Sequence, residues 1–297
     1  MVGDFIFCRF GLFLSLQNQR KTVLMIESLP YRKVVTIRRE ITTTGHSPLE
    51  VLADDYNIYF IKSAQDQKPS YRLISEFLCH YFLKCWHIPT PAIAEVTLDS
   101  KLITDGFSDK HKKHFYNRSC FGSQSIKDSI DLNEFFNPRS KPDFKKFYNP
   151  EILFKIALFD IWVENDDRKP TNNNILLQPV NGRFNIIAID HAYTFNTMNY
   201  DDLNPIFVSL SFNDTILLSP LGQSVKKRLK KDAQWLADVK ENFYLCVKLC
   251  EQNFIDISAS VPQHLGFDLR LQTKLHSFLF NEKRNSKVFT EFTSRLI

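Results

Sequence analysis

Apolar and polar residues alternate over short stretches near the start of the chain, a pattern typical of β-strands. Polar loops and turns separate these stretches, including the loop over 42–48 and the turn at Asp54-Asp55. Turn-forming residues between apolar runs favour strands that fold back on one another. We therefore expect a small β-rich region with strands over 34–37, 49–52, 58–62 and 92–98.

Helical periodicity is clearest over 71–87, where apolar residues return every three or four positions. The segment Pro89-Thr90-Pro91 ends this helix because proline lacks the backbone donor. A buried helix is expected to open at Asn149-Pro150-Glu151, since asparagine suits the N-cap and proline suits the first turn. Two more helices are predicted over 223–253 and 266–280.

A β-hairpin is predicted where Asn181-Gly182 separates the apolar runs 175–177 and 184–189. Asn-Gly between apolar runs is a strong hairpin signal, because both residues adopt the positive φ angles of a tight turn. In contrast, residues 100–147 are polar and rich in lysine. We expect that segment to be irregular and solvated.

The scarcity of glycine excludes several enzyme classes. The chain has 8 glycines in 297 residues, less than half the usual share of roughly 7%. No two of them lie closer than eight residues, so the glycine spacings of dinucleotide-binding, P-loop and α/β-hydrolase motifs do not occur. A net charge of +5 permits an anionic ligand and does not require nucleic acid, which we do not expect as a direct ligand.

The six cysteines include no C-x-x-C pair and are too few for a disulfide scaffold, so we expect reduced thiols and a cytoplasmic protein. No uninterrupted apolar run reaches 18 residues, which predicts no membrane span. Arg9 interrupts the apolar stretch near the start, unlike the core of a signal peptide. We expect residues 1–25 to be a poorly structured leader, or Met25 to be the true start.

Acidic and amide side chains gather around the predicted hairpin. Asp167 and Asn172 are five residues apart in the loop before it, and Asp190 follows its second strand. A tight hairpin brings its two ends together, so these oxygen ligands should converge, and such ligands suit Mg²⁺. Phosphoryl transfer uses one Asp to orient a hydroxyl, with an Asn and a second Asp holding the metal on the nucleotide. The alternative is that these residues merely cap turns.

A lysine and a glutamate that precede this loop in the sequence complete the set of side chains that a kinase needs. Lys62 ends a predicted strand, and Glu76 lies on the next helix. In protein kinases such a pair positions the lysine on the nucleotide phosphates. The loop around Gly45 is expected to cover the phosphates with its backbone N–H groups and the Ser47 hydroxyl.

Over about residues 30–200 these segments resemble the HipA-like kinase family. The resemblance rests on Gly45-His46-Ser47-Pro48, Tyr59-Phe60-Ile61-Lys62, Glu76, Ile88-Pro89-Thr90-Pro91, Asp160, Asn165-Asp166-Asp167-Arg168, Asn172 and Ile189-Asp190-His191. It implies an α+β, bilobal, protein-kinase-like fold. A small β-rich N-lobe over 26–99 and a larger, mostly helical C-lobe over 126–297 are then joined by an irregular connecting segment over 100–125.

The resemblance also implies roles for single residues. Asp167 would be the catalytic base, Asn172 and Asp190 would bind Mg²⁺, and Lys62, positioned by Glu76, would contact ATP. Two alternatives stay open here. Asn174 competes with Asn172 for the metal, and Asp166 competes with Asp167, although the five-residue spacing to Asn172 favours Asp167.

The sequence departs from the family pattern at two places. Lys169 stands where typical relatives and lipid kinases carry histidine, and His191-Ala192 replaces the Phe-Gly of ordinary kinases. The expected function is an ATP- and Mg²⁺-dependent serine/threonine kinase acting on a protein, with an antitoxin-like regulator as a further expected partner. The alternatives are a small-molecule or lipid kinase on the same fold, or a non-catalytic pseudokinase that binds a partner.

Overall fold

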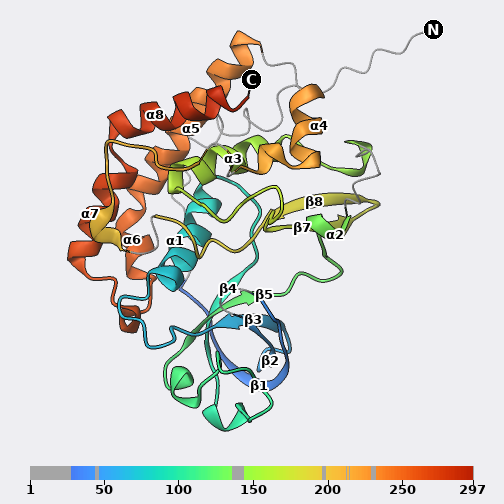
Figure 1. Cartoon of the computed structure of the whole chain (residues 1–297), viewed down its shortest axis with the longest axis vertical. Helices are drawn as coiled ribbons and strands as arrows, with labels where there is room; N and C mark the ends of the chain where they lie inside the picture. Colours follow the sequence, from blue (N-terminus) through green and yellow to red (C-terminus); the bar gives the residue numbers. More distant parts are fainter. Residues whose placement is uncertain are drawn as a thin grey trace.

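A small closed β-barrel and a larger, mainly helical region make up the described part of the chain (Figure 1). The computed structural model describes residues 28–43, 47–135, 144–195, 199–211, 213, 215–228 and 232–296. Strands and helices are both well represented, which confirms the α+β class. The expected leader over 1–25 and Gly45 lie outside the described residues.

Five strands close the barrel in the order β1-β2-β3-β5-β4. Neighbours pair antiparallel except β1 and β4, which are parallel. Leu49, Val51 and Ala94 belong to the buried apolar cluster of the barrel. The strands are β1 (Tyr31–Glu40), β2 (Leu49–Ala53), β3 (Ile58–Lys62), β4 (Ile93–Thr97) and β5 (Cys120–Gln124). The four strands expected from the sequence are present, and β1 is longer than its apolar run suggested.

Strand β5 corrects the prediction that residues 100–125 form only an irregular connection. It pairs with β3, where Lys62 faces Phe121, and with β4, where Ala94 faces Gly122. Glycine is required at 122, because an added Cβ would lie 2.4 Å from a methyl carbon of Val96. The sequence of β5 has too few apolar residues to predict a strand by itself. Its backbone pairing with β3 and β4, which are distant in sequence, determines the strand.

Helices form most of the remaining structure. They are α1 (Tyr71–Cys85), α2 (Leu132–Phe135), α3 (Ile152–Val163), α4 (Pro220–Arg228), α5 (Ala233–Gln252), α6 (Phe254–Ala259), α7 (Leu269–Leu279) and α8 (Glu282–Ser294). The single helix predicted over 223–253 is wrong: the segment contains α4 and α5, and Asp232 caps α5 by accepting from the backbone of Trp235 at 2.9 Å. The helices α6 and α8 were not expected. In the described residues, no helix has the length and apolar character to span a membrane.

Helix α3 lies at the centre of the larger apolar cluster. All twelve of its residues are buried, as expected for a helix whose residues are apolar on every side apart from Lys155 and Asp160. Trp162 of α3 packs against Phe82 and Trp86, with ring centroids 5.5 and 5.4 Å apart, which joins α3 to α1 and its C-terminal end. The helix starts at Ile152, slightly later than Pro150 suggested. A rigid, fully packed helix thus leads into the loop that carries Asp167.

The predicted hairpin is confirmed as β7 (Ile175–Val180) and β8 (Arg183–Ala188). Asn181 and Gly182 have φ angles of 46° and 78°, as the tight turn requires. The short strand β6 (Ile130–Asp131) extends this sheet on the β7 side. The hairpin therefore returns the chain to the loop that precedes it.

The turn between β2 and β3 is expected to make the stability of the folded protein depend on pH. Burial disfavours the Asp55 carboxylate, but hydrogen bonds from Asn57, Tyr59 and Arg32 outweigh it and lower the pKa of Asp55 from 3.8 to about 2. This contribution is present above pH 3.8 and is lost as the pH falls toward about 2. We expect Asp55→Asn to destabilise the protein at pH 7, and the difference from the wild type to shrink in urea titrations below pH 4. A difference that is constant with pH would contradict this.

Candidate active site

Lys62, Glu76 and Asp190 meet where the barrel faces the helical region. The Nζ atom of Lys62, the last residue of β3, lies 2.5 Å from Oε1 of Glu76 on α1. The same Nζ lies 3.0 Å from Oδ1 of Asp190, which follows β8. The Lys62 side chain is only 10% exposed, whereas that of Asp190 is 36% exposed. One ammonium group therefore bridges a buried carboxylate and a partly exposed one.

Glu76 has a second partner in this cluster. Its Oε2 atom accepts a hydrogen bond from the backbone nitrogen of His191 at 3.0 Å. Burial raises the pKa of Glu76, with Lys62 acting in the opposite direction. Burial also opposes the charge on Lys62, but Asp190 and Glu76 outweigh it and raise the lysine's pKa. The same ion pair overcomes burial at Asp190 and lowers the pKa of that carboxyl to about 2, so the Lys62–Asp190 pair is charged at neutral pH.

The loop after α3 holds Asp167 with two amides. The loop is tight, since Lys169 and Asn172 exchange backbone hydrogen bonds of 2.9 and 3.0 Å. The Asn172 amide donates to the backbone oxygen of Asp167 at 3.2 Å, and the Asn174 amide donates to its Oδ2 at 3.2 Å. Burial raises the pKa of Asp167, and the nearby Asp190 carboxylate raises it further. The structure therefore brings Asp167, Asn172 and Asp190 into one region, as the sequence predicted.

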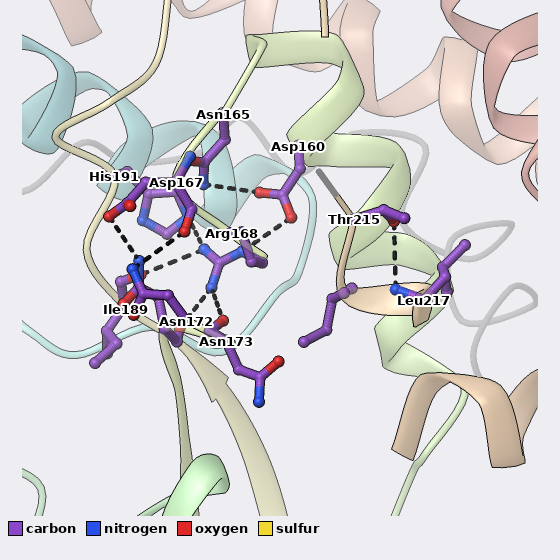
Figure 2. A network of polar contacts seen from close by, with 12 residues as sticks. Asp160, Asn165, Asp167, Arg168, Asn172, Asn173, Ile189, His191, Thr215 and Leu217 are labelled. Atoms are coloured by element: carbon purple, nitrogen blue, oxygen red, sulfur yellow. Dashed lines mark hydrogen bonds and ion pairs between the residues drawn. The ribbon is translucent and has the colours of Figure 1, made fainter. Parts of the chain in front are cut away.

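Arg168 lies among the residues of this region and contacts several of them (Figure 2). Its side chain is fully buried, and its Nε lies 2.9 Å from Oδ2 of Asp160 on α3. One terminal nitrogen donates to the backbone oxygens of Asn173 and Asn174. The other donates to the backbone oxygen of Ile189 and to the His191 ring at 2.8 Å. A single guanidinium thus connects α3, the Asp167 loop and the segment that carries Asp190.

Sequence reasoning assigned no role to Arg168 or to the ring of His191. Burial and the adjacent Arg168 lower the pKa of His191, which leaves its neutral ring able to accept from the arginine. A usable signal was Asp160, the single carboxylate in a sequence of α3 that is otherwise apolar except for Lys155. A carboxylate buried in such a helix requires a cationic partner, and Arg168 is the nearest arginine in the sequence.

The family match decides the identification. A family model described as HipA-like kinase matches residues 34–217, which is more than half of the chain. The chain belongs to the HipA-like kinase family. The resemblance seen in the motifs is therefore confirmed, and the protein is a kinase by family. A search of curated proteins gives no significant match.

Two solved kinases are similar to this HipA-like kinase in structure. The Helicobacter pylori proinflammatory kinase CtkA matches with a TM-score of 0.51 and 12% identity, covering 91% of this chain and 99% of that one. At this identity the likeness shows the fold alone, which is that of a kinase. A Golgi casein kinase with Mn/ADP bound matches with a TM-score of 0.40 and 11% identity, covering 95% of this chain and 76% of that one.

The base of the hairpin differs from the expectation that Asp190 returns beside Asn172, because Asn174 lies opposite Ile189, the residue before Asp190. The backbone nitrogen of Ile189 donates to the backbone oxygen of Asn174 at 3.1 Å, so Asn174 rather than Asn172 lies opposite the end of β8. Asn174 and Asp190 both have left-handed backbones, with φ of 47° and 55°. Asn and Asp are the side-chain-bearing residues that adopt this conformation most readily. The two residues flank the hairpin and turn the chain at both of its ends.

Ser47 lies at the Lys62 end of the barrel, because β2 begins at Leu49 opposite Ile61. Its side chain is buried, and its hydroxyl donates to the backbone oxygen of Thr43 at 3.2 Å. Nζ of Lys110 donates to the Ser47 hydroxyl oxygen at 3.0 Å. The hydroxyl is thus engaged within its own loop and with Lys110. Contact with a nucleotide phosphate stays a prediction for Ser47, as it does for Gly45.

The donor set of this HipA-like kinase fits a hard cation. Within the described residues, no group of three His, Cys, Asp or Glu side chains is placed to hold a metal ion. Asp190 and Asn172 instead offer carboxylate and amide oxygens, and Mg²⁺ is commonly held by one or two carboxylates together with water and substrate phosphates. The set therefore suits a metal ion that arrives with a nucleotide.

Proposed function

We propose that this HipA-like kinase transfers the γ-phosphoryl group of ATP to a serine or threonine hydroxyl of a protein. The contact of 3.0 Å between Lys62 and Asp190 carries the proposal, because it joins a barrel strand to the segment after the hairpin. In this proposal the barrel is the N-lobe of a bilobal kinase, and the helical region is its C-lobe. The connecting segment over 100–125 then contributes β5 to the N-lobe, and the nucleotide binds between the lobes.

In the proposed site, Asn172 and Asp190 would hold Mg²⁺, which neutralises charge on the nucleotide phosphates when bound. Lys62 binds phosphate oxygens, and Glu76 keeps its ammonium group in place through the contact of 2.5 Å. The lysine already bridges Glu76 and Asp190, so it needs little rearrangement to receive an anionic ligand. Such preorganised charge is usually a large part of the rate acceleration.

Asp167 acts on the acceptor. Its carboxylate accepts the proton of the hydroxyl as the hydroxyl oxygen bonds to the γ-phosphorus. The bond from that phosphorus to the bridging oxygen breaks, and ADP leaves with the electron pair. The half-buried position of Asp167 and its bond from Asn174 favour one orientation of this base. Holding the reacting groups in line supplies much of the remaining acceleration.

A transfer assay tests the proposal. The protein is incubated with Mg²⁺ and γ-labelled ATP, alone and with cell lysate, beside Asp167→Ala. We expect label in protein bands, chiefly on serine and threonine, with a loss of about 10²-fold or more in the variant. Label confined to small molecules or lipids would instead support that class of acceptor. Nucleotide binding without transfer would support a pseudokinase, and equal labelling by Asp167→Ala would remove the assigned base.

A further inference from the structure

Three consecutive asparagines before the hairpin have different partners. The Asn172 amide donates to the backbone oxygen of Asp167. The Asn173 amide donates to the side chain of Asn133 on α2, away from Asp167. The Asn174 amide donates to Oδ2 of Asp167 at 3.2 Å. Asn174 donates directly to the carboxylate expected to receive a proton, whereas Asn172 donates to the backbone of Asp167 and also helps to lower the pKa of its carboxyl.

The backbone of Asn174 is held from two sides. Its oxygen accepts from the fully buried guanidinium of Arg168 and from the backbone nitrogen of Ile189. The residue itself is only 9% exposed. Its left-handed φ of 47° is accessible to asparagine at low cost. Because two donors hold its carbonyl oxygen, the fold fixes the backbone from which the Asn174 side chain projects toward Asp167.

The chemistry separates the roles of Asn172 and Asn174. A metal ion needs an oxygen ligand, whereas a carboxylate needs a hydrogen-bond donor. Asn174 uses its donor nitrogen on Oδ2 of Asp167, whereas Asn172 uses its own on the backbone oxygen of that residue, so Asn174 is the amide that directly orients the carboxylate. We propose that Asn174 is a positioning residue that orients Asp167, while Asn172 supplies the oxygen for the metal. This inference rests on the proposed function.

Asn174→Gly is the sharpest variant, because glycine accepts the left-handed backbone and removes only the amide. We expect kcat to fall by about 10²-fold, as for a misplaced catalytic group, with the KM for ATP unchanged. The affinity for Mn²⁺ with ADP, measured by calorimetry, should also be unchanged. Asn172→Ala should weaken that affinity. Asn173→Ala is the matched control, and its transfer rate should equal that of the wild type.

Two results would overturn the assignment. A kcat near the wild-type value in Asn174→Gly would show that the bond to Asp167 has no role. A loss of Mn²⁺–ADP affinity equal to that of Asn172→Ala would make Asn174 a metal ligand. If Asn174→Gly fails to fold, Asn174→Asp replaces it, because aspartate also tolerates this backbone and replaces the donor with a negative charge.

A crystal structure of Asn174→Gly without nucleotide separates this inference from the proposed function. If the wild type transfers no phosphate, the proposed function fails, yet the orientation of Asp167 can still be seen. We expect its carboxylate to rotate or to occupy more than one orientation in the variant. An unchanged single orientation would show that other contacts hold Asp167 and would contradict the inference.

Discussion

Substitution of Asp190 by asparagine is expected to lower phosphoryl transfer by about 10²- to 10³-fold, the usual effect of removing one preorganised electrostatic group. Asparagine keeps the size of the side chain but removes the negative charge that faces Lys62 at 3.0 Å. The metal site then loses its carboxylate, and the lysine keeps Glu76 as its charged partner in this cluster. Initial rates with γ-labelled ATP measure the effect.

A second aspartate provides the matched control for this experiment. Asp201 pairs with Arg270 and Lys274 in an exposed cluster. Exposed pairs contribute little to stability, so Asp201→Asn should keep its rate. Circular dichroism should show that both variants are folded. Wild-type rates in Asp190→Asn would remove the metal assignment, even if nucleotide binding were weakened.

Substitution of Arg168 by methionine is expected to destabilise the protein by about 3–5 kcal/mol, because it leaves the Asp160 charge buried without its cation. Asp160 is only 2% exposed, and Arg168 is fully buried. The variant also removes donors from the backbone oxygens that Arg168 contacts. Urea unfolding followed by tryptophan fluorescence measures the change, since Trp162 lies two residues from Asp160.

The control for this variant is Arg270→Met. Arg270 also pairs with an aspartate, but its side chain is 55% exposed. Its removal should cost about 1 kcal/mol or less, as for other exposed pairs. The double variant Asp160→Leu, Arg168→Met should lose less stability than the sum of its single variants, because the lone buried charge is gone. Equal urea midpoints for Arg168→Met and the wild type would contradict the central role of Arg168.

Local signals account for the parts of the fold that the sequence predicted. The Asn181-Gly182 turn defines β7 and β8 without distant partners, and the periodicity over 71–87 defines α1. The order of Lys62 and Glu76 on neighbouring elements was enough to anticipate their contact. These features depend on residues that are close in sequence or on regular spacing, which a single sequence displays.

Distant contacts account for the parts that were missed. Strand β5 depends on β3 and β4, and Phe121 is its one large apolar side chain. The long helix predicted over 223–253 is divided into α4 and α5, with Asp232 at the start of α5. In the site, the sequence could not choose between Asn172 and Asn174. The choice depends on which amide reaches the Asp167 carboxylate and on which backbone oxygen Arg168 contacts.

The most direct test of this account is a crystal structure with Mg²⁺ and a non-hydrolysable ATP analogue. The account predicts the nucleotide between the barrel and the helical region, with Lys62 on its phosphates. Asn172 and Asp190 would coordinate the metal, and Asp167 would point toward the γ-phosphate without binding the metal. A nucleotide bound elsewhere, or a metal ion coordinated without Asp190, would contradict the account.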